Sequence, residues 1–503
     1  MSLEEKLAKL KTYLGEVNDL GAAASLLAWD QVTYMPVGGA VARQRQIALL
    51  QRLSHEKFIG REVGRLLDDL VPLEQELDPD SLDACLLRVA RRDYEHAVKI
   101  PPDFLAKLHE NAARSYQAWS EARPANDFSK VVEPLELTLE LSRRYGEFFP
   151  ESEHPADPLI DQSDEGMTVA LLRPLFRTLR RELVPLVEAI CSQESVDNSV
   201  LHRYYPENEQ LAFGLKIARD FGYDLGRGRQ DKSPHPFATN FSIDDVRITT
   251  WVDERDVREA LFSTLHESGH AMYEQGVSRS LEGTPLASGV SSGVHESQSR
   301  LWENLVGRSR GFWEHYYPSL RESFPEQLGG VSVDSFYRAI NSVRKSLVRT
   351  KADEVTYNLH VILRFELELE LLEGKLAIHD LPDAWRDRSY RYLGITPEED
   401  RDGVLQDVHW YSGAIGGAFQ GYSLGNILSA QFYEAAINAV PSIPSEIEAG
   451  NFTSLYTWLK FNIYRHGRKY PPQDLIKRAT SQDLMIEPYL RYLRTKYGKL
   501  YSL

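Results

Sequence analysis

The segment 266–270 reads His-Glu-Ser-Gly-His, with two histidines four positions apart and a glutamate directly after the first. It lies within a helical pattern predicted for residues 253–275. Four helical residues turn through about 400°, so His266 and His270 face one way while Glu267 projects to the side. Zinc accepts imidazole nitrogens and acidifies its water, whose proton an adjacent carboxylate can take. The spacing therefore predicts a hydrolytic zinc site with Glu267 as general base.

A catalytic zinc needs a third protein ligand and an open coordination position. The segment 293–303 follows a Gly/Ser-rich loop and is predicted to begin a second helix that carries His295, Glu296 and Glu303. Glu296 lies 26 residues past His270, a separation that lets an antiparallel helix return to the ion. His295 and Glu303 are alternatives that chemistry alone does not eliminate.

Gly269 lies inside the predicted metal-binding helix. Glycine at such a position costs about 1 kcal/mol relative to alanine. This cost makes sense where another part of the chain packs closely, so we expect a tight contact at Gly269.

Charge and cysteine content exclude several classes of protein. The 503 residues include 58 Lys and Arg against 74 Asp and Glu, a formal net charge of −16 that repels nucleic acids and anionic membranes. Cys85 and Cys191 are the only cysteines, too few for a disulfide framework or a cysteine zinc cage. No segment resembles a signal peptide or a membrane span. We therefore expect a cytoplasmic protein with no nucleic-acid partner and no membrane association.

Helical periodicity covers most of the chain, which predicts a mainly α fold. In the first part the pattern predicts helices over residues 3–17, 40–53 and 104–116, with Pro101-Pro102 and Pro124 as stops. This part lacks a cluster of catalytic residue types.

The segment 241–252 is the exception to helix, because Val246, Ile248 and Trp251 are mixed with polar residues in a β-branched run. It predicts a strand in a small β-sheet. No repeat or linker divides the chain. We expect one catalytic unit over residues 1–503 with two lobes, in which 1–150 is helical scaffold or lid and 230–430 holds the metal and substrate site.

The sequence resembles the thermostable carboxypeptidase Taq family of metallocarboxypeptidases, which is related more distantly to angiotensin-converting enzyme and neurolysin. The resemblance runs nearly end to end and rests on seven ordered motifs. They are Trp29 to Pro36, His235-Pro236-Phe237, Asp245 to Thr249, His266 to His270, His295 to Gln298, Val348 to Asp353, and Gly403 to Trp410.

The resemblance implies that one zinc ion per chain is held by His266, His270 and Glu296, with Glu267 as general base and later proton donor. Cobalt is expected to replace zinc. It also implies a two-lobed, saddle-like helical body with a deep groove and a small sheet near the active site, usually as a homodimer. The implied activity removes C-terminal residues from peptides with a free C-terminus, with broad tolerance for side chains.

An exopeptidase must hold the terminal carboxylate of its substrate, which calls for a cation beyond the metal. Arg247 and Arg349 are the candidates, because a guanidinium can grip a carboxylate bidentately. Each can instead form a structural ion pair, with Asp245 and Asp353 as the nearest partners within the motifs. His235 is expected to shape the groove wall.

The tetrahedral oxyanion needs a donor beside the metal, and by resemblance His409 and Tyr422 suit that role. The family pattern Gly-Tyr-Phe-Pro-Ser/Thr-Tyr departs here, because this chain has Ala418 in place of the first tyrosine and Gln420 in place of the proline. With Gly421 beside them, we expect a more flexible loop.

Two other functions remain to be weighed. A metallo-oligopeptidase or peptidyl-dipeptidase on the same scaffold would cleave amidated peptides as well as free acids. A noncatalytic peptide-binding protein would retain the fold without turnover, and the intact set of predicted metal ligands and base argues against it.

Overall fold

The computed structural model describes residues 1–503, and helices make up most of it. The first third consists of helices only: α1 (Leu3–Thr33), α2 (Ala40–Phe58), α3 (Arg61–Asp69), α4 (Val71–Glu76), α5 (Leu82–Lys99), α6 (Pro102–Ala125) and α7 (Val132–Glu147). The middle contains α8 (Asp157–Ser163), α9 (Val169–Cys191), α10 (Glu207–Phe221), β1 (Gln230–Lys232), β2 (Ala238–Ser242), β3 (Asp245–Thr250), α11 (Val257–Gly276), α12 (Ser292–Arg300) and the π-helical segment η5 (Leu301–Val306). The remainder contains α13 (Arg310–Ser323), α14 (Pro325–Leu328), α15 (Val333–Ile340), α16 (Tyr357–Leu372), α17 (Leu381–Leu393), α18 (His409–Ser412), α19 (Gln420–Ala439), α20 (Ile443–Glu448), α21 (Thr453–Asn462), α22 (Pro472–Thr480) and α23 (Glu487–Tyr501).

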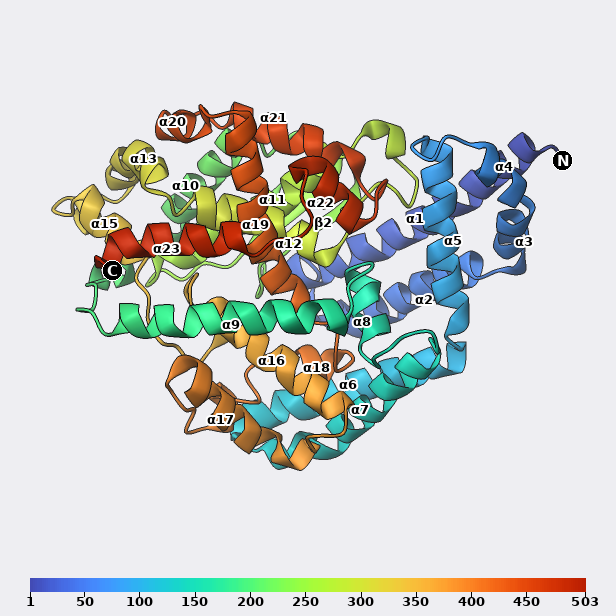
Figure 1. The fold of residues 1–503 in the computed structure, drawn as a ribbon, viewed down its shortest axis with the longest axis horizontal. Coiled ribbons are helices and arrows are strands. Elements are labelled where there is room, and N and C mark those ends of the chain that lie inside the picture. The colour runs from blue at the N-terminus through green and yellow to red at the C-terminus, as the bar shows by residue number, and fades with distance from the viewer.

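The molecule contains two large hydrophobic cores, and α19 contributes residues to both (Figure 1). Helix α9 crosses the middle of the view, with α6, α7, α16 and α17 below it and α10, α11, α13 and α19 above it. One core draws on α7, α9 and α16, and the other on α10, α11 and α13. The predicted mainly α, two-lobed architecture is confirmed.

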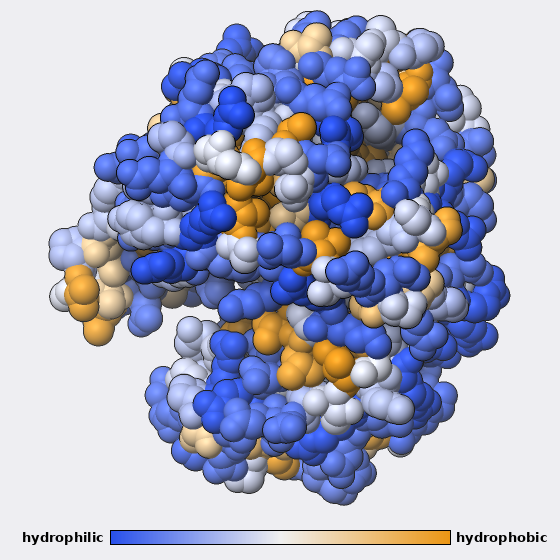
Figure 2. Space-filling view, turned by 90° about the vertical axis from the view of Figure 1, so that its left-hand side faces the viewer, coloured by the Kyte–Doolittle hydropathy of each residue, from blue (hydrophilic) through white to orange (hydrophobic).

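Figure 2 shows one face of the molecule with a notch between a larger upper part and a smaller lower part. Apolar residues gather at its mouth, whereas polar residues cover most of the surrounding surface. The notch fits the groove expected between two lobes. None of the helices is both long enough and apolar enough to cross a membrane.

The first helices are longer than their periodicity predicts. Helix α1 continues to Thr33 and α2 to Phe58, because few breakers interrupt them. Pro101 and Pro102 do mark the start of α6, where proline's missing N–H costs nothing. The prediction that Pro124 stops this helix is off by one residue, since Pro124 lies in its last turn and Asn126 caps it with φ of 54°.

The sheet contains three strands in the order β1-β3-β2. Central β3 pairs parallel with β1 and antiparallel with β2. The predicted strand 241–252 is wrong in its bounds, because Phe241 and Ser242 belong to β2 and a turn separates them from β3. Val246 and Ile248 of β3 are fully buried in the core that also contains α11. The sheet thus lies beside α11, the helix predicted to bind the metal.

Helix α12 is packed between α11 and α19 through glycines. A Cβ atom on Gly269 of α11 would lie 2.6 Å from the carbonyl oxygen of Gln298 and 2.6 Å from the Cα of Ser299. A Cβ atom on Gly425 of α19 would overlap with the side chain of Glu296. The close contact expected at Gly269 is therefore present, and it brings the two helices of the predicted site together.

Candidate metal centre

His266, His270 and Glu296 converge from α11 and α12. Their ligand atoms all lie within 4.8 Å of one another. The Oε2 atom of Glu296 is 3.6 Å from Nε2 of His266 and 3.3 Å from Nε2 of His270. Ligand atoms around a tetrahedral zinc lie roughly 3.4 Å apart, given metal–ligand bonds of about 2.1 Å. The three side chains thus have the donor types and spacing that a zinc ion requires.

Local signals in the sequence set the bounds of both helices. Asp256 caps α11 by accepting a hydrogen bond from the backbone N–H of Arg258, so the helix begins four residues later than predicted. Ser291 caps α12 by accepting from the N–H of Val294. Glu296 lies one turn into α12, which places its carboxylate opposite the two histidines.

His295 and Glu303, the two alternatives to Glu296 as third ligand, contact the histidines at Nδ1, whereas Glu296 faces Nε2. Glu303 in η5 accepts from Nδ1 of His266 at 2.9 Å. The Nδ1 atom of His295 is 2.5 Å from Nδ1 of His270. Because both contacts use Nδ1, the Nε2 atoms of the two histidines remain directed at Glu296.

Arg300 compensates the negative charge of Glu296. Its Nε atom donates to Oε1 of Glu296 at 2.7 Å, and its Nη1 atom lies 3.4 Å from Glu303. Burial would raise the pKa of Glu296, but the guanidinium of Arg300 and the neighbouring histidines hold that pKa well below its usual range. Glu296 is therefore a carboxylate at neutral pH, with Oε2 facing the histidines while it also accepts from the Ser299 hydroxyl at 3.2 Å.

Glu267 lies on the same helix as the two histidines and is 6% exposed. Burial raises the pKa of Glu267 to about 7, and the carboxylate of Glu296 adds to the shift. A carboxyl group with a pKa near neutrality can both take up and release a proton.

His409 and Tyr422 are brought together at the start of α18 and α19. Nε2 of His409 lies 3.2 Å from the Tyr422 hydroxyl. Burial, with the charge of Arg349 in addition, lowers the pKa of His409 to about 4, so the imidazole is neutral. Burial raises the pKa of Tyr422 to about 12, so its hydroxyl keeps its proton. Both groups are thus neutral donors at physiological pH.

Arg349 is paired with Asp407 and not with Asp353, the partner considered from the sequence. Its Nη2 atom lies 2.8 Å from Oδ1 of Asp407, and its Nη1 atom donates to the Tyr357 hydroxyl at 2.9 Å. Asp353 instead accepts from the backbone N–H groups of Val355 and Thr356 at the start of α16. Asp353, which is nearer to Arg349 in the sequence, therefore caps α16 and does not pair with Arg349.

Asp407 also binds Arg364, which is fully buried. Burial would raise the pKa of Asp407, but the two guanidinium groups hold it well below its usual range. Two positive charges thus share one carboxylate in a buried position.

Arg247 forms the ion pair considered from the sequence, with both oxygens of Asp245 at 2.8 Å. Its guanidinium lies 4.4 Å from the ring centre of Trp29 in α1 and 5.0 Å from that of Phe241. This residue therefore fastens the end of α1 to the sheet.

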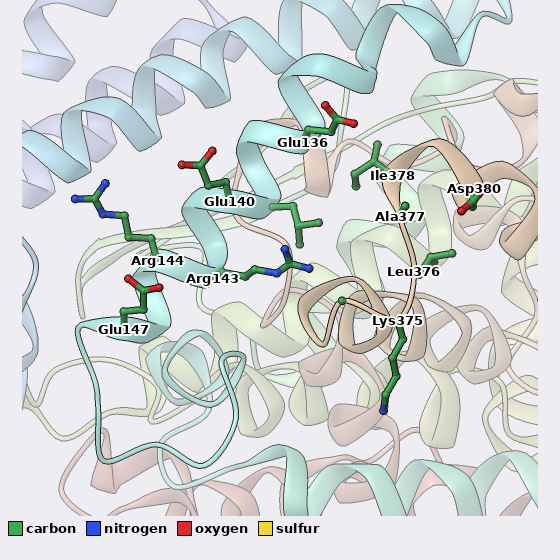
Figure 3. Close-up of a pocket in the computed structure, with 12 residues that line it drawn as sticks. Glu136, Glu140, Arg143, Arg144, Glu147, Lys375, Leu376, Ala377, Ile378 and Asp380 are labelled. Atoms are coloured by element: carbon green, nitrogen blue, oxygen red, sulfur yellow. The ribbon is translucent and has the colours of Figure 1, made fainter.

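His235 lies on the exposed segment between β1 and β2, where its carbonyl accepts a hydrogen bond from Ser233. A surface pocket of about 910 Å³ contains none of the predicted site residues. Figure 3 shows it between α7 and residues 374–380, lined by side chains of both charges.

The segment around Ala418 and Gln420, for which a more flexible loop is expected from the sequence, makes packing and hydrogen-bond contacts. Gln420 is 1% exposed, and its Nε2 atom lies 3.1 Å from the buried carboxylate of Asp164. The same carboxylate accepts from the N–H of Gly293 at 2.7 Å. Gln420 thus ties the start of α19 to the first turn of α12.

Four further residues around the site were not predicted from the sequence: Arg300, Glu274, Asp407 and Asp164. Arg300 is four residues past Glu296 and Glu274 four past His270, so helical spacing was available as a signal. Asp407 belongs to a recognised motif, but its pairing with Arg364 joins segments that periodicity cannot relate. No motif or spacing in the sequence relates Asp164 to the site.

Comparisons with known proteins agree along the whole chain. The family model of the carboxypeptidase Taq (M32) metallopeptidases matches residues 9–497. The chain is 39% identical to thermostable carboxypeptidase 1 of Thermus thermophilus, covering 100% of both chains, and 36% identical to carboxypeptidase 1 of Bacillus subtilis, covering 97% of both.

The fold is similar to solved structures as well. The crystal structure of an M32 carboxypeptidase from Deinococcus radiodurans superposes with a TM-score of 0.96 at 50% identity, covering 99% of this chain and 100% of that one. A carboxypeptidase of Pyrococcus furiosus gives a TM-score of 0.94 at 36% identity, over 98% of this chain and 99% of that one. The chain therefore belongs to the carboxypeptidase Taq (M32) metallopeptidase family and is a metallocarboxypeptidase.

Proposed function

We propose that the protein is a zinc carboxypeptidase that binds one zinc ion per chain through His266, His270 and Glu296. The convergence of two Nε2 atoms and one carboxylate oxygen, with Glu267 buried beside them, is the observation that carries this proposal. When bound there, zinc supplies a Lewis acid that polarises the scissile carbonyl and acidifies the attacking water. Cobalt has similar ligand preferences and is expected to substitute.

Glu267 acts as the general base. Its carboxylate takes the proton of the attacking water and then delivers it to the nitrogen of the departing amino acid. Burial, which raises the pKa of Glu267 to about 7 in the metal-free protein, favours its taking up the proton. Beside a divalent cation the pKa is lower, so the group begins the reaction ionised at neutral pH.

Tyr422 and His409 stabilise the oxyanion that develops on the carbonyl oxygen. The Tyr422 hydroxyl is a neutral donor whose neighbourhood includes the charge of Glu296. His409 contacts that hydroxyl and holds its orientation. Neutral donors fixed before the reaction lower the barrier without being deprotonated themselves.

Arg349 holds the terminal carboxylate of the substrate. It lies 5.0 Å from the ring centre of Tyr422, and both it and Arg300 contact Tyr357, which connects it to the metal side of the site. Asp407 balances only one of the two arginines that bind it, so a substrate carboxylate would supply the missing negative charge. Arg247 is the weaker candidate, because Asp245 pairs with it alone and balances its charge.

A cytoplasmic homodimer completes the proposal. The two cysteines are free and far apart in the chain, as expected in a reducing compartment. The homodimer is carried over from the family resemblance. Light scattering coupled to size-exclusion chromatography tests it, and a monomer mass at micromolar concentration would contradict it.

Mass spectrometry on peptides with free and amidated C-termini tests the exopeptidase assignment. We expect stepwise release of single residues from the free acid, loss of this activity on chelation, and no release from the amide. Equal cleavage of both peptides would contradict recognition of the carboxylate and would favour an oligopeptidase. A peptide bound but never cleaved by the zinc-loaded protein would favour a noncatalytic binding function.

A further inference from the structure

A hydrogen-bonded chain leads from His270 away from the metal centre, through His295 to Glu274. Nδ1 of His270 is 2.5 Å from Nδ1 of His295, and Nε2 of His295 is 2.7 Å from Oε1 of Glu274. We propose that His295 and Glu274 are positioning residues that fix the orientation and tautomer of His270. The inference rests on the proposed metal centre and adds residues that act on it indirectly.

The direction of each hydrogen bond follows from the position of Glu296. Nε2 of His270 faces this carboxylate, so a metal ion there leaves Nδ1 as the nitrogen that carries the proton. His270 therefore donates from Nδ1, and His295 accepts at its own Nδ1. The proton of neutral His295 must then lie on Nε2, from which it donates to Glu274. With this placement of protons, each hydrogen bond from His270 to Glu274 has one donor and one acceptor.

The carboxylate at the end of the chain is itself anchored on both oxygens. Nδ2 of Asn240 in β2 donates to Oε2 of Glu274 at 2.8 Å. The backbone N–H of Gly289 donates to Oε1 at 3.1 Å. Glu274 is 7% exposed, so these donors fix a buried charge. The chain thus connects α11 to α12 and to the sheet.

Packing around His295 holds its ring in the plane that these hydrogen bonds need. The rings of His270 and His295 are 26° from parallel with centroids 4.6 Å apart, which fits an edge-to-edge contact through nitrogen. The Tyr273 ring lies against the other side of His295, with centroids 5.3 Å apart. A Cβ atom on Gly289 would overlap with Cδ2 of His295, so only glycine leaves room for the ring.

The two metal-facing histidines are therefore supported in different ways. His266 donates directly to the carboxylate of Glu303, whereas His270 reaches a carboxylate only through a neutral imidazole. A carboxylate one ring away raises the basicity of its histidine less than one in direct contact. Loss of the Glu274 charge should thus weaken metal binding less than loss of the Glu303 charge.

The zinc dissociation constant, measured by competition with a chromophoric chelator, tests the inference without reference to activity. His295→Phe removes both hydrogen bonds and is expected to weaken zinc binding about 10- to 100-fold. His295→Gln keeps one acceptor and one donor and should remain within about threefold of the wild type. Glu274→Gln should lose less affinity than Glu303→Gln.

Gly289→Ala displaces the His295 ring while every hydrogen-bonding group is retained, so it should weaken zinc binding at least about tenfold. Gly330→Ala is the matched control, because a Cβ atom there meets nothing within 4 Å, and it should bind zinc as the wild type does. The melting temperature of each metal-free protein reports whether the fold is intact. If His295→Phe does not fold, Gly289→Ala decides the result.

Wild-type zinc affinity in His295→Phe or in Gly289→Ala would overturn the inference. So would a His295→Gln variant as weak as His295→Phe, since packing alone would then explain the loss. Wild-type affinity in His266→Ala would instead contradict the proposed metal centre itself, so the two failures are distinguishable.

Discussion

The close approach of α11 and α12 at Gly269 makes a quantitative prediction. An alanine Cβ at this position would lie 2.6 Å from backbone atoms of Gln298 and Ser299, which cannot rotate away. The helices must separate by about 0.8 Å before this distance reaches the 3.4 Å of ordinary packing. That displacement moves Glu296, three residues before Ser299, away from the histidines.

We expect Gly269→Ala to cost about 1–3 kcal/mol through overpacking, of which the better helix propensity of alanine returns about 1 kcal/mol. A misplacement approaching 1 Å at a catalytic centre costs up to about 10²-fold in rate. Urea unfolding of the metal-free protein, zinc affinity and kcat/KM measure the three effects. Gly21→Ala in α1 is the matched control, because a Cβ atom there meets nothing within 4 Å, and it should stabilise the fold by up to about 1 kcal/mol. A Gly269→Ala variant that gains stability like the control, with wild-type zinc affinity, would refute the packing argument.

Further predictions concern buried charges. Burial raises the pKa of Glu368 to about 7 from the 4.5 of an exposed glutamate, so the folded protein keeps a proton that the unfolded chain has lost. The free energy of unfolding should therefore decrease as the pH rises from about 4.5 to 7, by a few kcal/mol in order of magnitude. Glu368→Gln keeps an acceptor for the Trp410 indole, which donates at 2.7 Å, and should make this decrease smaller, with the remainder due to Glu267. Urea unfolding at pH 5 and pH 8 measures both proteins, and an unchanged slope in the variant would contradict the shifted pKa. Arg349→Lys loses the bidentate grip and should lower kcat/KM for free-acid peptides by roughly 10²-fold, whereas Arg247→Lys should act mainly on stability. Peptide kinetics together with thermal melts separate the two, and the reverse order would make Arg247 the carboxylate-binding residue.

Helical periodicity and the spacing of His266 and His270 were sufficient to predict the fold class and the helix that carries the histidines. Such signals are local, since they depend on residues within a few turns of one another. The predicted ends of helices and strands were less accurate. Asp256 was not predicted as the N-cap of α11, and parts of β2 and β3 were predicted as one strand.

Pairings between distant segments could not be read from the pattern. Arg349 has an aspartate four residues away, yet it binds Asp407, because Asp353 caps the following helix instead. The roles of His295 and Glu303 likewise depend on how α12 and η5 turn relative to α11, which spacing does not specify. The prediction for Gln420 rested only on its difference from the family pattern, because its contact with Asp164 joins segments that are distant in the sequence.

The most direct test of the account compares wild type with Glu267→Gln, measuring both bound zinc and release of the C-terminal residue. The side chains proposed to hold zinc are unchanged in this variant, so it should bind one zinc ion per chain with affinity close to that of the wild type. Without a carboxylate to accept the proton, release should be slower by at least about 10²- to 10⁴-fold. A Glu267→Gln variant that binds zinc and still releases the C-terminal residue at the wild-type rate would contradict the central claim.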